Sequence, residues 1–358
     1  MKRIIAILLS MMMCAGLLAG CGVAPAPSDA AASAAQPASE PAEPAAPAAS
    51  ATGAVPTGDK PIALLIPSPV GDPFIALCVK GLEKLSEETG AELKIIETLD
   101  KAEYEDQVRA MAELGANPVY CMWGDLSELA VKVAPEYPDT KFILADVYMK
   151  TNQPNVSSIS VDPYASSFIA GYIAANSTEV GKVGFIAHAD RPVSRRYRDG
   201  FIAGVHYVDE SIPVEVAYVG NDQDPVKGQE VAKLMIQNNG VDLIFQSASR
   251  SGLGVIAGCA DQGIKCIGSD DWQGDVDPCV FWSALKPFDE ALYVEGKSVF
   301  DGTYESGDKA YGLEQGLPMY DQRDFDKLPE ELQQGVLAVV EGIKSGEIQI
   351  TEDENVVQ

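Results

Sequence analysis

The sequence predicts an α/β protein built from two doubly wound lobes, each with a parallel β-sheet. From residue 61 onward, short apolar runs alternate with helix-like stretches, and uninterrupted apolar strands are typical of parallel sheets that helices cover on both faces. The alternation occurs in two consecutive series of similar size. About 300 residues follow Lys60, more than one hydrophobic core usually serves, which favours two lobes.

The first series contains four apolar runs that we expect to be strands. They are IALLI (62–66), LKII (93–96), PVYCMW (118–123) and KFILAD (141–146). The first run is followed by FIALCVKGLEKLSEETG, a helix-like stretch that ends on Gly90, a residue that commonly stops helices. Strands and helices therefore alternate in this half.

The second series repeats the arrangement. Its expected strands are KVGFIA (182–187), VEVAYV (214–219), DLIFQ (242–246) and KCIGSD (265–270), and its expected helices lie near 193–208, 225–239 and 251–262. Ligands of doubly wound sheets bind outside the carboxyl ends of the strands. The cleft between the two lobes is therefore where we expect a site.

The opening MKRIIAILLSMMMCAGLLAG has the layout of a secretory signal peptide, with a basic tip, an apolar centre and small residues at its end. We therefore predict a signal peptide at residues 1–20. The sequence Leu18-Ala19-Gly20-Cys21 resembles the lipobox of bacterial lipoproteins, which implies that Cys21 carries the lipid. The mature protein would then be extracytoplasmic and anchored to the cell membrane by acyl chains. The alternative is an ordinary signal peptide with an incidental cysteine.

Residues 21–58 consist almost entirely of Ala, Pro, Ser and Gly after Cys21, without hydrophobic periodicity. Such a composition cannot build a core. We expect a disordered tether between the lipidated cysteine and the folded lobes.

The chain is strongly acidic: it has 26 Lys and Arg residues against 53 Asp and Glu residues, and a formal net charge of -27. Nucleic-acid binding requires basic groups that neutralise phosphates. The charge therefore argues against a nucleic-acid partner and favours solubility.

Five cysteines remain after Cys14 leaves with the signal peptide and Cys21 takes the lipid. They are Cys78, Cys121, Cys259, Cys266 and Cys279. No pair has the spacing of metal ligands, and most lie in apolar segments, so buried free thiols are favoured and no metal site is expected. A disulfide from Cys266 to Cys259 or Cys279 is the alternative.

Three long stretches carry a family resemblance: NVSSISVDPYASSFIAGYIAANSTEVGKVGFIAHADRPVSRRYRDGFIAGVHYV (155–208), YVGNDQDPVKGQEVAKLMIQNNGVDLIFQSASRSGLGV (218–255) and IGSDDWQ (267–273). They resemble the basic membrane protein family of solute-binding lipoproteins, many of which bind purine nucleosides for ATP-driven importers. The resemblance spans nearly all of residues 61–350. It includes SGLGV and the closing LPEE…SGEI (328–348).

The resemblance implies a type I periplasmic-binding-protein fold with three crossovers, near Val161, Lys286 and Leu313. The implied N-terminal lobe comprises residues 59–161 plus 287–313, and the C-terminal lobe comprises residues 162–286 plus 314–350. It also implies a monomer that takes a small-molecule ligand to an ABC permease and ATPase complex. No cofactor is expected.

The family pattern maps three ligand-binding residues onto this chain. Phe74 occupies the place of a base-stacking phenylalanine, Asp270 that of an aspartate accepting hydrogen bonds from ribose hydroxyls, and Lys286 that of a lysine that reaches the sugar or holds the lobes together. Each has a structural alternative: Phe74 as a core aromatic at a helix start, Asp270 as a cap for the next segment, and Lys286 as a surface residue.

Four further residues lie at strand or helix ends beside the expected cleft. Asp72 is either a ligand acceptor or, just before Pro73, a helix N-cap. Trp123 is a ligand wall or hinge packer, and Trp272 covers a ligand or packs its loop. Arg250 stacks on a ring, pairs with an anion, or is a solvated turn residue.

Departures from the family bear on the ligand. Pro67 and Ser68 stand where the family usually has an aspartate that reads the purine edge. Ser249 and Arg250 replace two glycines, and the segment 162–164 replaces acidic residues. A modified nucleoside, another nitrogenous ring compound or an anionic ligand therefore stays open.

The segment DRPVSRRYRDG (190–200) gathers four arginines in an acidic chain. We expect most of them to lie on a helix surface and to pair with local acids. Arg191 is the alternative exception, at the lip of the cleft.

Enzyme chemistry is not indicated. The two histidines are His188, at a strand end near the cleft, and His206, in a helical stretch, and neither has a triad partner set. SGLGV lacks the lysine and spacing of a phosphate-binding loop. We therefore expect a binding protein and not an enzyme; a lipoprotein that presents its ligand to a membrane sensor and a structural surface lipoprotein are the alternatives to an importer component.

Overall fold

The computed structural model describes residues 59–350. The predicted signal peptide, the lipidation at Cys21 and the tether lie outside the described residues. Within residues 59–350, no helix is both long enough and apolar enough to cross a bilayer.

Eleven strands form two parallel sheets in the described part of the chain. The first sheet has the order β11-β5-β4-β3-β1-β2, and the second has the order β10-β9-β8-β6-β7. The strands are β1 (Ile62–Ile66), β2 (Leu93–Glu97), β3 (Val119–Met122), β4 (Phe142–Ala145), β5 (Val156–Val161), β6 (Val183–Ala187), β7 (Val214–Tyr218), β8 (Leu243–Ser247), β9 (Lys265–Asp270), β10 (Val280–Leu285) and β11 (Gly307–Tyr311).

Helices alternate with these strands along the chain. The α-helices are α1 (Pro73–Thr89), α2 (Tyr104–Glu113), α3 (Trp123–Val133), α4 (Tyr164–Ser177), α5 (Pro192–Val208), α6 (Pro225–Asn239), α7 (Arg250–Gln262), α8 (Phe288–Phe300), α9 (Gln322–Phe325) and α10 (Glu330–Ser345). Short 3₁₀ turns occur at Lys101–Glu103, Ala134–Glu136 and Leu313–Gln315. The predicted fold class of two doubly wound parallel sheets is confirmed.

All eight apolar runs that the sequence marks as strands form strands. In β1 the residues point alternately to the two faces of the first sheet: Ile62, Leu64 and Ile66 join one buried cluster, and Ala63 and Leu65 join another. An uninterrupted apolar run is needed here because helices cover both faces.

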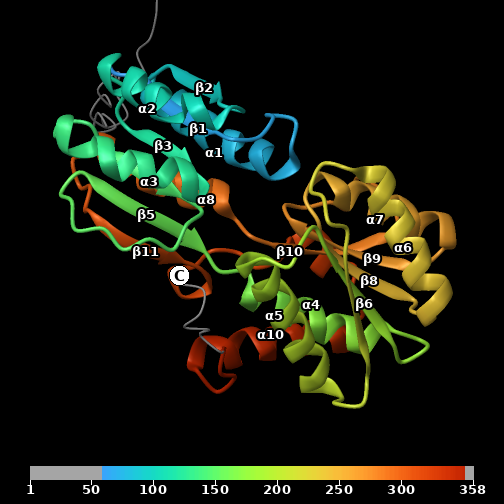
Figure 1. Ribbon diagram of the computed structural model, residues 1–358. Helices are drawn as coiled ribbons and strands as arrows, with labels where there is room; N and C mark the ends of the chain where they lie inside the picture. Colours follow the sequence, from blue (N-terminus) through green and yellow to red (C-terminus); the bar gives the residue numbers. More distant parts are fainter. Residues whose placement is uncertain (1–58, 351–358) are drawn as a thin grey trace, which may run out of the picture. The chain divides into compact units, whose positions relative to one another are not determined.

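We call the part built on the first sheet the N-terminal lobe and the part built on the second the C-terminal lobe. The chain passes between the sheets after β5, after β10 and after β11. Figure 1 shows β11, from late in the chain, beside β5, and the two strands pair in parallel from Gly307↔Ser157 to Tyr311↔Val161. Helix α8 packs on α1, and α10 packs on α4.

The SGLGV motif is a helix-packing motif in this chain. A Cβ on Gly252 would lie 1.9 Å from Oε1 of Gln246, and one on Gly254 would lie 1.7 Å from the carbonyl oxygen of Pro225. The Pro225 contact is with backbone, so only glycine at position 254 lets α7 approach α6 this closely. The motif thereby sets the packing distance between α6 and α7.

The cysteines of the described residues are free thiols, as the sequence favours, and the alternative disulfide does not form. Cys78, Cys121, Cys259 and Cys266 are buried, and Cys279 is half-buried. Burial raises the pKa of the Cys78 thiol, and the neighbouring Cys259 thiol together with burial raises the pKa of Cys266, which makes both poor nucleophiles.

Candidate ligand-binding cleft

Both lobes line a cavity of about 520 Å³ at the carboxyl ends of their strands. The N-terminal lobe contributes residues that follow β1, β3 and β4, including Phe74, Trp123 and Asp146. The C-terminal lobe contributes residues at the ends of β6, β8, β9 and β10. The location agrees with the general rule for open α/β sheets, and the volume suits a small molecule.

Four residues other than glycine adopt a left-handed backbone among the described residues, and all four line this cavity. They are Trp123, Asp146, Ser249 and Asp270, with φ angles of 61°, 59°, 53° and 71°. Residues with a Cβ rarely adopt this conformation. Strained backbone of this kind gathers at ligand-binding sites, because there it directs side chains toward the ligand.

An ion pair between Lys286 and Asp146 joins the two lobes inside the cavity. The ammonium group of Lys286 donates to Oδ1 of Asp146 at 2.6 Å, and the indole Nε1 of Trp123 donates to Oδ2 of the same carboxylate at 3.2 Å. Only 2% of Lys286 is exposed. Lys286 directly follows β10, at the point where the chain leaves the second sheet, so this pair connects a crossover with the wall of the site.

Two aromatic rings from the N-terminal lobe form one wall. The rings of Phe74 and Trp123 are nearly parallel, at 13°, with centroids 6.5 Å apart. Phe74 also contacts Phe288 in the core, and the Lys286 ammonium lies 4.6 Å from its ring centroid. Phe74 therefore packs in the core, one of its two predicted roles, and also lines the cavity; its role in base stacking stays a prediction.

Asp270 is held in place by two hydroxyl donors. Tyr197 donates to Oδ1 at 2.6 Å and Ser269 donates to Oδ2 at 3.3 Å. Burial raises the pKa of the Asp270 carboxyl, against the opposing effects of the Lys286 charge and the Tyr197 hydrogen bond. Its orientation is thus fixed by the protein before any ligand is present.

Asp72 lies outside the cavity lining, and 2% of it is exposed. Its Oδ1 accepts from the amides of Phe74 and Ile75 and caps α1. Its Oδ2 accepts from Gln223 at 2.8 Å and from Ser249 at 2.5 Å. The helix-cap reading of this residue is confirmed, and the same carboxylate also joins the two lobes.

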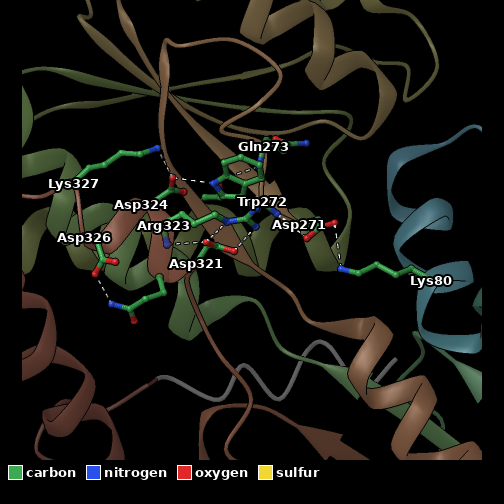
Figure 2. Close-up of polar contacts among 11 residues, drawn as sticks. Lys80, Asp271, Trp272, Gln273, Asp321, Arg323, Asp324, Asp326 and Lys327 are labelled. Carbon is green, nitrogen blue, oxygen red and sulfur yellow. Dashed lines mark hydrogen bonds and ion pairs between the residues drawn. The ribbon is translucent and has the colours of Figure 1, made fainter. Parts of the chain in front are cut away.

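Arg250 and Trp272 also lie outside the cavity lining. Arg250 is an exposed residue at the start of α7. The guanidinium of Arg323 stacks 3.5 Å from the Trp272 ring centroid, and the Trp272 indole donates to Oδ1 of Asp324 at 3.0 Å. Figure 2 shows Trp272 held in this way against the segment from Asp321 to Lys327. Of the seven predicted ligand-binding residues, the cavity thus brings together Phe74, Trp123, Asp270 and Lys286.

The arginines of residues 190–200 divide into three groups. Arg195 pairs with Asp190 at 2.8 Å and Arg198 with Asp199 at 2.7 Å, as expected for a helix surface. Arg196 differs, since it is buried and pairs with Asp162 at 2.5 Å, which ties α5 to the end of β5. Arg191 lines the cavity.

Four cavity residues were not predicted from the sequence: Asp146, Tyr197, Glu128 and Asp222. A signal was present for Asp146, because it ends the run KFILAD and the carboxyl end of a parallel strand is a site position. His188 lines the cavity, and its pKa is lowered mainly by burial and by the charge of Arg191. Among residues 59–350, no group of three His, Cys, Asp or Glu side chains is placed to hold a metal ion.

Comparisons with known proteins agree with this geometry. Basic membrane protein A2 of Borrelia garinii subsp. bavariensis is 26% identical over 74% of this chain and 80% of its own length. A purine-binding protein of Brucella abortus is 27% identical over 69% of both chains. The crystal structure of an ABC transporter solute-binding protein from Aeropyrum pernix matches with a TM-score of 0.68 at 24% identity, over 82% of this chain and 95% of that one, and shows the same fold.

The Bmp family model, described as ABC transporter substrate-binding protein PnrA-like, matches residues 60–354. This is a family of solute-binding proteins and not of enzymes. The chain belongs to this family of PnrA-like ABC transporter substrate-binding proteins.

Proposed function

We propose that this protein captures a nucleoside or nucleoside-like solute between its lobes and delivers it to an ABC importer. The observation that carries the proposal is one cavity with two near-parallel aromatic rings on one wall and an oriented carboxylate and a buried ammonium group on another. A nucleoside has the matching parts, a flat ring and a hydroxyl-bearing sugar. The purine-binding relative supports the same ligand class.

The aromatic wall would hold the ring of the ligand. Aromatic side chains gain both apolar burial and stacking energy from a flat heterocycle. Phe74 and Trp123 present such faces from the N-terminal lobe. Pro67 and Ser68 replace the family's purine-reading aspartate, so we extend the ligand class to nucleoside-like rings.

The sugar would be bound by Asp270 and Lys286. A carboxylate can accept two hydroxyl donors in addition to the bonds that it already makes, and an ammonium group has three donors. Asp270 is held by Tyr197 and Ser269, and Lys286 by Asp146, so neither has to be reoriented on binding. Such preorganisation lowers the entropic cost of association.

Capture would proceed by closure of the lobes. A solute stabilises the closed state only through contacts that the open state lacks, and here the ring wall and Asp270 belong to different lobes. The permease would then recognise the closed form. The predicted lipid on Cys21 and the tether would keep the protein near the permease and raise its effective concentration.

A thermal-shift screen of the purified protein tests the proposal. Nucleosides, nucleobases, flavins, sugars and amino acids are compared, and a ligand present at about 100 times its Kd should add about 2.7 kcal/mol to the free energy of unfolding. We expect a shift with nucleosides that Asp270→Asn removes. The matched control Asp275→Asn, an exposed position after the same strand, should keep the shift.

A shift with sugars or amino acids alone would overturn the nucleoside assignment. A nucleoside shift that persists in Asp270→Asn would overturn the assigned role of the carboxylate. Uptake of a labelled nucleoside by cells with and without the protein then tests delivery to the importer.

A further inference from the structure

The cavity carries more negative than positive charge. Four carboxylates line it: those of Glu128, Asp146, Asp222 and Asp270. Two cations also line it, Arg191 and Lys286. Burial and the charge of Arg191 lower the pKa of His188, so its imidazole is neutral at pH 7. The formal net charge of the residues that line the cavity is therefore negative. Asp72, close to this lining, accepts hydrogen bonds only from uncharged donors.

The positive charge of Lys286 is already committed to Asp146 at 2.6 Å. Glu128 and Asp222, in contrast, line the cavity and form no ion pair within residues 59–350. Both are exposed in the absence of a ligand. Arg191, the other cation of the lining, is exposed and forms no ion pair among the described residues. A closed cleft would set this single cation against Glu128, Asp222 and Asp270, and the remaining negative charge would be costly to enclose.

Aromatic side chains surround the same space. Phe74, Trp123, Tyr148 and Tyr197 all line the cavity. The face of an aromatic ring attracts a cation, and indole does so best. Several aromatic rings combined with unpaired carboxylates form the chemistry that recognises organic cations.

We propose that the ligand's ring is positively charged, a cationic heteroaromatic nucleoside held against the Trp123 face and selected by Glu128 and Asp222. This inference rests on the proposed function and names the ligand class within it. The positive charge of the ring offsets the negative charge that Arg191 and Lys286 leave unbalanced. The same field repels nucleoside phosphates.

Two pairs of ligands separate ring charge from shape. Nicotinamide riboside has a permanently charged pyridinium ring, and benzamide riboside has the same outline with a neutral ring. In the second pair, 1-methyladenosine is protonated at neutral pH and adenosine is neutral. Calorimetric titration of the full-length protein measures each Kd.

We expect the charged member of each pair to bind at least about tenfold more tightly, a difference of about 1.4 kcal/mol. Glu128→Gln and Asp222→Asn should each reduce this charge preference at least about threefold. Glu83→Gln removes the same charge from an exposed position of α1 outside the cavity, so it should keep the preference. Raising the salt concentration should also reduce it, because ions screen the attraction.

The outcomes separate the two proposals. Equal affinity within both pairs would overturn the inference about ring charge and leave the proposed function standing. The charge preference could also survive in Glu128→Gln, in Asp222→Asn and at high salt. That result would overturn the role assigned to these two carboxylates. If none of the four nucleosides binds, the proposed function itself fails.

Discussion

The hydroxyl of Ser249 donates to Oδ2 of Asp72 at 2.5 Å and joins the start of α7 to the start of α1 across the cleft. Ser249 makes this bond with a φ of 53°, a backbone conformation that favours glycine. The bond therefore holds a serine in strain, and it bridges the lobes through protein atoms alone. We infer that it sets part of the equilibrium between open and closed forms.

Two substitutions at Ser249 separate the hydrogen bond from the strain. Ser249→Ala removes the bond and keeps the unfavourable φ, whereas Ser249→Gly removes both. We expect both variants to bind ligand more weakly and to populate a more open ligand-free form, measurable as a larger radius of gyration in solution scattering. Ser249→Gly should be more stable than Ser249→Ala by about 1 kcal/mol. Unchanged scattering and affinity in both variants would contradict the inferred role in closure.

Lys286→Met should destabilise the protein by about 3–5 kcal/mol, because it leaves the largely buried carboxylate of Asp146 without its partner. The side chains of the pair are 3% and 14% exposed. Chemical denaturation measures the effect. Lys84→Met breaks an exposed pair with Glu290 and should cost less than about 1 kcal/mol.

The double variant Lys286→Met/Asp146→Asn provides a further check. It leaves no unpaired charge, so its loss of stability should be smaller than the sum of the two single losses. Additive losses would show that the two groups do not interact.

Ligand affinity should rise with pH through the pKa of Asp270. Burial raises the pKa of this carboxyl above 3.8 in the ligand-free protein, whereas hydroxyl donors from a ligand favour the ionised form. Binding therefore releases a proton in the window above pH 3.8, and affinity falls as the pH drops through it.

Calorimetry in buffers of different ionisation enthalpy, from about pH 4 to about pH 7, measures this proton release. Asp270→Asn should abolish the release. Proton uptake on binding would show that the sign of the linkage is wrong.

Gly254→Ala should destabilise the protein by about 3 kcal/mol, because its Cβ would lie 1.7 Å from the Pro225 carbonyl oxygen and push α6 from α7. Thermal or chemical unfolding measures the change. Gly71→Ala is the control, since no heavy atom lies within 4 Å of a Cβ added there. Equal stability of the two variants would mean that α6 and α7 can move apart freely.

Apolar runs predict eight of the eleven strands in residues 59–350, because strands covered by helices must be apolar. The runs do not mark β5, β10 or β11: β5, VSSISV, is interrupted by serines, and the sequence of β11, GDKAY, alternates between half-buried and exposed residues. An edge strand is paired on one side only, so it needs no continuous apolar run. Strand β11 is held by its pairing with β5 and by a buried glutamate, since Lys309 donates to both oxygens of Glu295 at 2.8 Å.

A site residue could be predicted from the sequence where the adjoining strand or helix also fixes the direction of its side chain. Lys286 directly follows β10, and Phe74 lies in the first turn of α1. Trp272 was not predictable in this sense, because the loop after β9 turns it toward Arg323 and Asp324. The place of Asp146 at a strand end could be read from the sequence, but its partners could not, since Trp123 and Lys286 come from other parts of the chain.

The four left-handed residues of the cavity have a consequence for laboratory evolution of this chain. Trp123, Asp146, Ser249 and Asp270 are each positions where glycine would relieve backbone strain. At three of them glycine would cost more than it relieves, because Asp146 and Asp270 hold the partners Lys286 and Tyr197, and Trp123 packs beside Phe74. Selection for heat resistance alone would therefore favour glycine at Ser249, and selection for growth on a scarce solute should restore the serine.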